Sequence, residues 1–243
     1  MNQTTASPCI ENGIDPLLAE LREAVELFHA APGGTDRQRL LAFVREVFRH
    51  AHGAEVAAVH PNLLGFSSGA ALRAVLGYRS GNAEPLFSEQ YLEGPADRLI
   101  AARFGQPVRR DELVEVGNFA LADPGQARWV IAATTTYLAA AGYRWVMFTA
   151  TRPLANAFRR LGLRPLPLAP ADPARLPDGG ASWGRYYDGG PAVYAGDILA
   201  GYQKLHGAAG HRHGHLKSLL ETAWELGAQN LLRGSALNWQ VAR

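Results

Sequence analysis

The sequence has little cysteine and no long apolar run, and each shortage excludes a class of protein. Among its 243 residues Cys9 is the single cysteine, which excludes a disulfide framework and a cysteine-based metal site. No stretch reaches the roughly 20 apolar residues that a membrane-spanning helix needs. The opening segment, MNQTTASPCIENGID, lacks the basic and apolar regions of a secretory signal. We therefore expect a cytoplasmic protein with no membrane span.

An excess of charge of one sign is also missing. The chain has 24 Lys+Arg against 22 Asp+Glu, a formal net charge of +2, which leaves no basic footprint for a nucleic acid. Four of the eight histidines lie in the segment HGAAGHRHGH, residues 206–215. Because a glycine-rich segment without acidic residues does not hold the fixed geometry of a metal site, we expect a solvated linker there and no metal.

What is present is the composition of a folded chain. Hydrophobic residues make up 47% and charged residues 19%, which excludes a disordered protein. At roughly 150 residues per domain, the length suits one large domain with extensions or two small ones. We divide the chain into an N-terminal tail and helix over residues 1–35, a central domain over 36–205, and a linker with a C-terminal helix over 206–243.

Apolar residues recur at helical spacing in several segments. Asp15-Pro16 provides a helix start, and the spacing continues to Phe28, just before the APGG breaker. The other predicted helices begin near Asp36, lie within 84–104, and cover residues 126–141, 154–161 and 216–232, the last of them amphipathic.

Strand patterns occupy the middle of the chain. They predict a hairpin of residues 63–67 and 72–78 and further strands over 113–121, 144–149 and 164–168. Residues 170–190 are rich in Pro, Gly and Asp and are expected to be loop. The resulting β-α-β-α-β order predicts an α/β (α+β) domain, with a central mixed sheet flanked by helices.

The strand VEVGNF, residues 114–119, carries the strongest candidate for chemistry. Side chains alternate along a strand, so Glu115 and Gly117 share one face while the valines share the other. A carboxylate among apolar neighbours is desolvated, which raises its pKa toward the range of a general base. The structural alternative is a pair with Arg109 or Arg110. A glycine within a strand indicates a bulge or a close approach of a ligand.

Two further segments lie where α/β folds bind ligands. The turn ADPGQAR, residues 122–128, precedes a helix whose N-terminal N–H groups suit a phosphate, although a turn simply capped by Asp123 is the plainer explanation. The segment FTATRP, residues 148–153, runs from a strand end into a helix. Thr149, Thr151 and Arg152 are therefore expected to line a cleft, unless the threonines only cap the helix.

Several ordered motifs together resemble the thermostable hemolysin family. They are LFSEQYLEGPAD (86–97), VEVGNFAL (114–121), FTATRPLANAFRRLGL (148–163), LAPADPARL (168–176) and WGRYYDGGPAVYAGDI (183–198). The resemblance covers about residues 38–205. The family name describes a lytic phenotype, whereas the order of elements is similar to that of the GNAT acyltransferase superfamily and implies a GNAT-like fold.

The comparison with GNAT enzymes concerns two motifs. Their Gln/Arg-x-x-Gly-x-Gly/Ala loop binds the pyrophosphate of coenzyme A; Gly125-Gln126-Ala127 matches its second half, and Ala122 replaces the opening Gln/Arg. A later helix of the superfamily carries Tyr-x-x-x-Gly-Phe, and the spacing from Phe158 to Gly162 matches it. Phe158 has no hydroxyl with which to protonate a departing thiolate, the role assigned to that tyrosine.

VEVGNFAL is also similar to the Glu-x-Ser-Arg-Phe strand of acyl-homoserine-lactone synthases. Glu115 and Phe119 match, and Gly117-Asn118 replace Ser-Arg. Those enzymes share the GNAT fold, take acyl chains from acyl carrier protein and acylate an amine. The resemblance, with the incomplete pyrophosphate loop, implies an acyl thioester donor on acyl carrier protein or coenzyme A, and no permanently bound cofactor.

We therefore expect an N-acyltransferase that moves a fatty acyl chain to a small amine. Glu115 is the predicted general base, and the bulge near Gly117, helped by the Asn118 amide, is the predicted oxyanion site. The residues expected on the donor side are Phe119, Gly125, Ala127, Arg128, Thr149, Arg152 and Phe158. The resemblance further implies an acceptor side and cleft wall formed by Glu89, Tyr91, Trp183, Tyr186 and Asp197.

Two alternatives remain open at this point. A cytolysin that lyses membranes directly would need export and a membrane-seeking surface, and neither is visible. An inactive GNAT-like module that only binds acyl carrier protein is compatible with the loss of the tyrosine, although Glu115 in the strand argues against it. The sequence does not define an oligomeric state.

Overall fold

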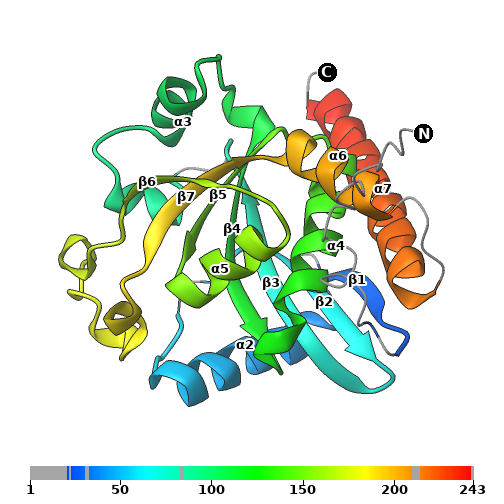
Figure 1. The fold of residues 1–243 in the computed structure, drawn as a ribbon, viewed down its shortest axis with the longest axis horizontal. Coiled ribbons are helices and arrows are strands. Elements are labelled where there is room, and N and C mark those ends of the chain that lie inside the picture. Colours follow the sequence, from blue (N-terminus) through cyan, green and yellow to red (C-terminus); the bar gives the residue numbers. More distant parts are fainter. Residues whose placement is uncertain are drawn as a thin grey trace, which may run out of the picture.

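A computed structural model describes residues 21–241, apart from residues 22, 31–32, 58, 83–84 and 210–213. Its centre is a seven-stranded sheet with the order β1-β2-β3-β4-β5-β7-β6 (Figure 1). The strands are β1 (Glu26–Ala30), β2 (Asn62–Ser68), β3 (Ala71–Ser80), β4 (Leu113–Leu121), β5 (Trp145–Ala150), β6 (Leu166–Pro170) and β7 (Ala192–Asp197). The helices are α2 (Arg37–His52), α3 (Ala96–Phe104), α4 (Ala127–Ala140), α5 (Arg152–Arg160), α6 (Ile198–Ala209) and α7 (His215–Val241).

Short 3-10 helices connect several of these elements. They are η1 (Phe87–Tyr91), η2 (Arg110–Glu112), η3 (Pro124–Gln126), η4 (Pro173–Arg175), η5 (Ala181–Trp183) and η6 (Tyr186–Gly189). The last three lie in the segment 170–190, which the sequence predicts as loop.

The sheet is mixed because one crossover connection joins its two central strands. β4 and β5 pair in parallel through α4, as the predicted β-α-β order requires. The other neighbouring strands of the described sheet pair antiparallel. β2 and β3 form the predicted hairpin, whose turn places Gly69 in the left-handed region at φ 55°.

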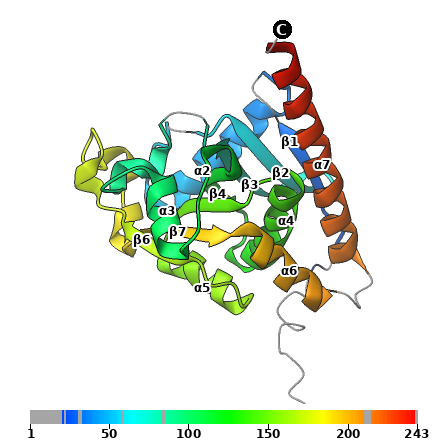
Figure 2. The same cartoon turned by 90° about the horizontal axis from the view of Figure 1, so that it is seen from above.

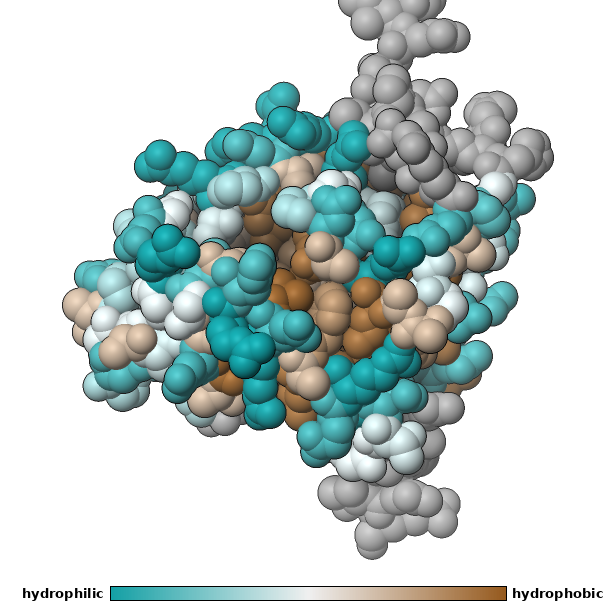
Figure 3. All heavy atoms as spheres, turned by 90° about the horizontal axis from the view of Figure 1, so that it is seen from below, coloured by the Kyte–Doolittle hydropathy of each residue, from teal (hydrophilic) through white to brown (hydrophobic). Residues whose placement is uncertain are grey.

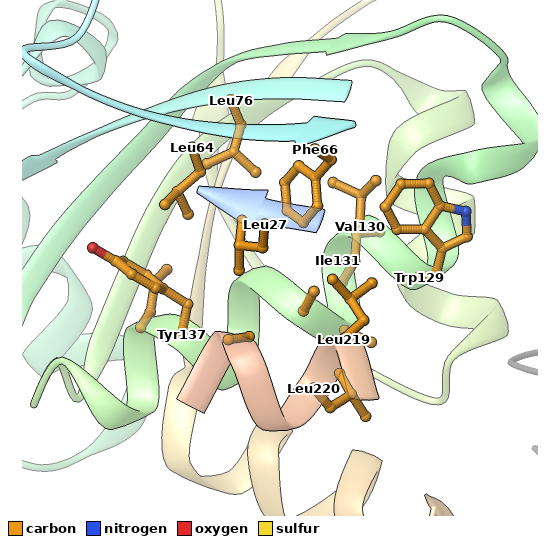
Figure 4. Packing of buried hydrophobic residues seen from close by; sticks show 14 of the residues in the cluster. Leu27, Leu64, Phe66, Leu76, Trp129, Val130, Ile131, Tyr137, Leu219 and Leu220 are labelled. Carbon is orange, nitrogen blue, oxygen red and sulfur yellow. The ribbon is translucent and has the colours of Figure 1, made fainter. Parts of the chain in front are cut away.

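Helices cover both faces of the sheet, as Figure 2 shows for α2 on one side and for α4 and α7 on the other. On the α4 face, apolar side chains of β1, β2 and β3 pack against α4, with α6 and α7 outside it. Figure 4 shows this core, in which Leu64, Phe66 and Leu76 face Ile131 and Leu219. On the opposite face, α2 packs on β2 and β3, and α3 with η1 packs on β5 and β7. β2 and β3 therefore bury side chains on both of their faces, which is why they are apolar rather than alternating.

The N-terminal helix predicted up to Phe28 is wrong where the structure describes it. Residues 26–30 form β1, which pairs antiparallel with β2, while the start of that prediction, residues 15–20, lies outside the described residues. The deciding contact is tertiary, because the Phe28 ring lies over Gly65, where a β-carbon would come within 2.4 Å of it. An aromatic side chain that packs over a glycine of the neighbouring strand favours the sheet over local helical spacing.

The C-terminal part also differs from the prediction. β7 and α6 follow the loop directly, although the sequence indicated neither. Residues 206–209 of the predicted linker complete α6, where Leu205 is buried and the His206 ring packs on Tyr202 at 4.1 Å. Residues 210–213 lie outside the described residues. The final helix is confirmed as α7, which buries Leu219 and Ala223 in the core.

The fold class is confirmed: a mixed α/β sheet flanked by helices on both faces. In the part of the chain that the structure describes, no helix has the length and apolarity to cross a membrane.

Candidate active site

The sheet opens between its two central strands. The parallel pairing of β4 and β5 ends at Val116 and Phe148. Beyond that point β5 continues beside β7 as far as Ala150, and β4 continues beside β3 as far as Leu121. Each strand keeps its outer neighbour and loses its inner one, so a gap forms at the C-terminal ends of both strands.

A bulge in β4 lies at this gap, as Gly117 predicts. Two residues of β4, Asn118 and Phe119, lie opposite the single residue Leu76 of β3. Asn118 has φ 51° and is the one non-glycine residue with positive φ in the described chain. The extra residue restarts the alternation of side chains. Phe119 therefore packs against the α4-side core, while Asn118 contacts His60 on the α2 side.

A cavity of about 1390 Å³ occupies the gap. Its lining on the α2 side includes Phe48, His52, His60, Arg79, Phe87, Tyr91, Glu115, Trp183, Tyr186 and Tyr187. Its lining on the α4 side includes Phe119, Arg128, Ile131, Leu138, Leu154, Phe158, Leu163, Ile198 and Lys204. Because these residues belong to both faces of the sheet, the cavity passes between β4 and β5. On the face drawn in Figure 3, hydrophobic residues lie at the bottom of a hollow with a hydrophilic rim.

Glu115 projects from the middle of β4 to the α2 side and is 1% exposed. Its Oε2 accepts the backbone N–H of Phe87 at 2.8 Å, and its Oε1 accepts that of Ser88 at 2.6 Å. These residues begin η1, so the carboxylate both lines the cavity and fixes the turn beside it. The pairing with Arg109 or Arg110 that we considered from the sequence does not form, because each of these arginines pairs with another acid.

Burial raises the pKa of the Glu115 carboxyl. Desolvation raises the pKa of its carboxyl, and this effect outweighs the hydrogen bonds from the side chain and backbone of Ser88 and from the backbone of Phe87, and the positive charge of Arg79, which all lower it. A carboxylate with a raised pKa is a better proton acceptor near neutral pH. The burial and the raised pKa expected from the strand pattern are thus present, and the role of Glu115 as general base stays a prediction.

Asn118 and His60 hold the bulge together. The Oδ1 of Asn118 accepts the backbone N–H of His60 at 3.0 Å. The imidazole of His60 lies against Gly117, where a β-carbon would come within 2.5 Å of Nε2. The neighbouring strand also carries a glycine at this point, because a β-carbon on Gly77 would come within 2.8 Å of His60. Two glycines thus make room for one buried histidine.

His60 is a site residue that the sequence did not single out. Burial, with the nearby charge of Arg79, lowers its pKa to about 4, so the imidazole is neutral at physiological pH. A neutral imidazole is able to accept or donate a proton. The one sequence signal that could have indicated His60 is the pair of glycines in β3 and β4, because strand glycines leave room for a bulky side chain.

Aromatic side chains form the far wall of the α2 side. The Trp183 ring lies 5.4 Å from that of Tyr186 and 5.7 Å from that of Phe87. The hydroxyls of Tyr91 and Tyr187 are 2.6 Å apart. The structure thus brings three of the expected acceptor-side residues, Tyr91, Trp183 and Tyr186, to one wall. It adds Tyr187 and Phe87, which are not among the predicted site residues.

The turn before α4 is capped by its own aspartate. The N–H of Gly125 donates to Asp123 Oδ1 at 2.8 Å, and the N–H of Ala127 bonds to the carbonyl of Pro124. Gly125 and Ala127 line the cavity, but these two N–H groups are already bonded in the turn, so they do not point at a phosphate. The plainer explanation of the turn, an Asp-capped start of a helix, describes it best.

Arg128 is the part of this turn that remains suited to an anion. It lines the α4 side of the cavity and forms no ion pair or hydrogen bond with any side chain that the structure describes. Three further cations, Arg160, Arg164 and Lys204, line the same side. The α4 side of the cavity therefore carries positive charge from side chains rather than from a backbone cradle.

Of the residues expected on the donor side at or after the end of β5, two line the cavity and one does not. Thr149 lines the cavity, and its hydroxyl lies 3.0 Å from that of Ser88. Phe158 of α5 also lines it and stacks on Phe148 at 4.7 Å. Arg152 is not among the lining residues and lies instead against Gly190.

Two acidic residues expected on the acceptor side are held in ion pairs. Glu89 accepts the backbone N–H groups of Leu86 and Ala96 and pairs with Arg110 at 2.5 Å. These contacts fix the η1 loop, and Glu89 does not line the cavity. Asp197 does line it, on the α4 side, but pairs with Arg144 at 2.7 Å.

No group of side chains suited to a metal ion occurs among the described residues. Three histidines of the 206–215 segment lie outside or at the edge of that part of the chain, so the expectation for this segment stays a prediction.

Residues 30–202 match the thermostable hemolysin family. The chain belongs to that family. The match begins at the last residue of β1 and ends within α6, so this hemolysin-family region comprises nearly the whole sheet and both walls of the cavity. No curated protein matches the sequence.

Solved structures share the fold of this hemolysin-family chain at low identity. FeeM, an N-acyl amino acid synthase from uncultured soil microbes, has a TM-score of 0.53 at 13% identity, over 77% of this chain and 98% of its own. The acyl-homoserine-lactone synthase LasI has a TM-score of 0.52 at 13% identity, over 76% and 96%. BjaI, a CoA-dependent acyl-homoserine lactone synthase, has a TM-score of 0.51 at 14% identity, over 82% and 99%. The resemblance to acyl-homoserine-lactone synthases is thus confirmed for the fold.

Proposed function

We propose that this protein is an N-acyltransferase that moves a fatty acyl chain from a thioester to an amine. The observation that carries the proposal is the position of Glu115. A buried carboxylate of raised pKa lies at the point where β4 and β5 separate, inside a cavity that opens to both faces of the sheet. Two substrates that enter from opposite faces would meet beside it.

The α4 side suits the donor. Its walls include the apolar side chains of Ile131, Leu138 and Leu163, and Arg128 stands near the start of α4. An acyl chain would pack on the apolar wall, and the phosphate of the donor's pantetheine arm would lie near the arginine. Acyl carrier protein and coenzyme A both carry this arm, so either thioester fits the proposal.

The reaction requires one proton transfer that the site is equipped to make. The amine nitrogen attacks the thioester carbonyl, the C–N bond forms and the C–S bond breaks. Glu115 takes the proton of the amine, directly or through a water, and the thiolate leaves. Developing charge on the carbonyl oxygen would lie beside the bulge at Gly117 and Asn118, where the strand ladder is interrupted. Phe158 supplies no proton to the thiolate, which would take one from solvent.

The proposal also explains how an acyltransferase comes to be associated with lysis. A fatty acyl amide has one apolar chain and a polar head, so it is a surfactant. Cells that make it would lyse erythrocytes without contact between the protein and the membrane. A cytolysin that acts directly is the competing function, and an inactive module that only binds acyl carrier protein is the other.

A paired assay on the purified full-length protein distinguishes these functions. Thiol release from dodecanoyl-CoA and from dodecanoyl carrier protein is measured with pooled amines, the amide is identified by mass spectrometry, and erythrocyte lysis is scored in parallel. We expect thiol release that requires an amine, and no lysis until product accumulates. Lysis without consumption of thioester would establish the cytolysin, and binding of carrier protein without turnover would establish the inactive module.

A further inference from the structure

Arg79 carries the one permanent positive charge among the described residues that line the α2 side of the cavity. It lies on β3 directly opposite Glu115 of β4. Residues opposite each other in an antiparallel pair project to the same face and are neighbours. The other basic side chains on this wall are His52 and His60. Burial is the main reason that their pKa values are lowered, so they carry no permanent positive charge near neutral pH.

The guanidinium of Arg79 has hydrogen-bond donors that are available to a ligand. Its Nη1 donates to the carbonyl of Pro85 at 2.9 Å, and no carboxylate in the described part of the chain lies within ion-pair distance of it. Its charge still acts on its neighbours, since it lowers the pKa of both Glu115 and His60. A partly exposed guanidinium with free donors at a cavity wall is the usual partner of a carboxylate, which it binds through two parallel hydrogen bonds.

We propose that the acceptor carries a carboxylate next to its amine, as an α-amino acid does, and that Arg79 binds this carboxylate. The inference rests on the proposed function and specifies its acceptor. In an α-amino acid the two groups are attached to one carbon, so a carboxylate on Arg79 places the amine beside the neighbouring Glu115. The C–N bond forms, the C–S bond breaks and the amine proton passes to Glu115, while the acceptor carboxylate is unchanged. The product is an N-acyl amino acid.

The same geometry disfavours other amines. A simple alkylamine leaves the Arg79 charge without a partner, and a polyamine brings a second positive charge close to it. The aromatic wall formed by Trp183, Tyr186 and Tyr187 would instead favour a positively charged acceptor, because aromatic faces attract cations. The charge of the acceptor is therefore the property to measure.

The test compares amino acids with the amines that result from their decarboxylation. Leucine is paired with isopentylamine and phenylalanine with phenethylamine, each in competition for dodecanoyl-CoA or dodecanoyl carrier protein. We expect the intact protein to prefer the amino acid of each pair. Arg79→Gln should reduce that preference by about tenfold to a hundredfold, the usual effect of a charge-assisted hydrogen-bonded pair, and Arg79→Lys should reduce it less. The same base serves both acceptors, so a change in Glu115 cancels in the ratio.

Arg103→Gln, on the exposed side of α3, is the matched control and should keep the preference of the intact protein. Equal use of both acceptors, or a preference that survives Arg79→Gln, overturns the inference while the acyltransferase stands. If no acceptor is acylated, the proposed function fails, and binding then decides the inference. N-dodecanoyl-leucine should raise the melting temperature more than N-isopentyl dodecanamide does, and the difference should vanish in Arg79→Gln; equal shifts overturn it.

Discussion

At the scale of single residues, the site consists of polar groups that the fold has removed from water. Glu115, His60 and Asn118 are all buried, and each forms a hydrogen bond with a neighbouring residue. Glu115 accepts two backbone N–H groups, and Asn118 accepts the N–H of His60. Burial without charge neutralisation costs stability, which is why such an arrangement indicates function as well as structure.

Glu115→Gln should lower the acylation rate by on the order of 10²- to 10⁴-fold, the usual contribution of a general base. In the intact protein kcat/KM should rise with pH through a pKa above 4.5, the ordinary value of a glutamate, because burial raises it. The pH–rate profile of thiol release measures both effects. Glu112→Gln, just before β4, should leave the profile unchanged, and a variant at Glu115 that retains full activity would place the base elsewhere.

The same raised pKa has a consequence for stability. The folded chain binds the Glu115 proton more tightly than the unfolded chain does, so the free energy of unfolding falls as the pH rises from about 4.5 through the raised pKa. Glu115→Gln lacks this dependence. Urea unfolding of both proteins across that range separates a folding defect from a catalytic one.

Asn118→Ala should reduce the free energy of unfolding by about 1–3 kcal/mol. The variant loses the acceptor of the buried His60 N–H, and alanine tolerates a φ of 51° less well than asparagine does. Asn118→Gly is the informative comparison, because it relieves the backbone and still loses the acceptor. Equal urea midpoints for the intact protein and both variants would contradict this account of the bulge.

At the scale of elements, α7 is joined closely to the domain. It packs along α4, and Gly227 lies at the crossing, where a β-carbon would come within 2.3 Å of the Tyr137 carbonyl. Below it, Tyr137 and Tyr78 share a buried hydrogen bond of 2.7 Å. Close approach of two helices at a glycine depends on the missing side chain.

Gly227→Ala should therefore lower the melting temperature by several degrees, because α7 must move away from α4 to admit the methyl group. Gly207→Ala in α6 is the matched control, since no atom lies within 4 Å of its added β-carbon. We expect this control to be neutral or slightly stabilising, because alanine favours a helix over glycine. Equal melting temperatures for the two variants would show that α7 is only loosely attached.

At the scale of the whole molecule, the cavity joins two surfaces of different character. Cations line its α4 side, while aromatic rings and Glu115 line its α2 side. In the proposed function, the two substrates enter from opposite faces and meet at the gap between β4 and β5. Changes at one end should therefore alter the affinity for one substrate.

Arg128→Ala should raise the KM for the acyl thioester about tenfold and leave kcat nearly unchanged, because a phosphate contact on the donor arm contributes to binding rather than to chemistry. The KM for the amine should not change. Arg98→Ala, on the exposed side of α3, serves as the control. A fall in kcat alone would remove Arg128 from the donor arm.

The sequence predicted the centre of the fold better than its ends. The bounds of β4 agree with the predicted strand 113–121, and the bounds of α4 and β5 lie within one residue of the predicted ones. These segments are periodic and flanked by turn residues, so their secondary structure can be predicted from the local sequence. The sequence predicts a helix where β1 forms, because the packing of the Phe28 ring over Gly65 leaves no signal in the local sequence. β7 and α6 were missed, because the glycines in their sequences weaken both patterns.

The sequence by itself determined that this chain folds around a mixed sheet, that Glu115 is a carboxylate in the middle of a strand, and that the strand is interrupted at Gly117. Each follows from spacing along the chain. Only the tertiary structure decided that Arg79 stands beside Glu115, that His60 lies over Gly117, and that Glu89 is held in an ion pair. The reason is physical: burial, charge and hydrogen bonding depend on which distant segments meet, and β4 meets β3, η1 and the end of the loop before β2 only after the sheet has formed.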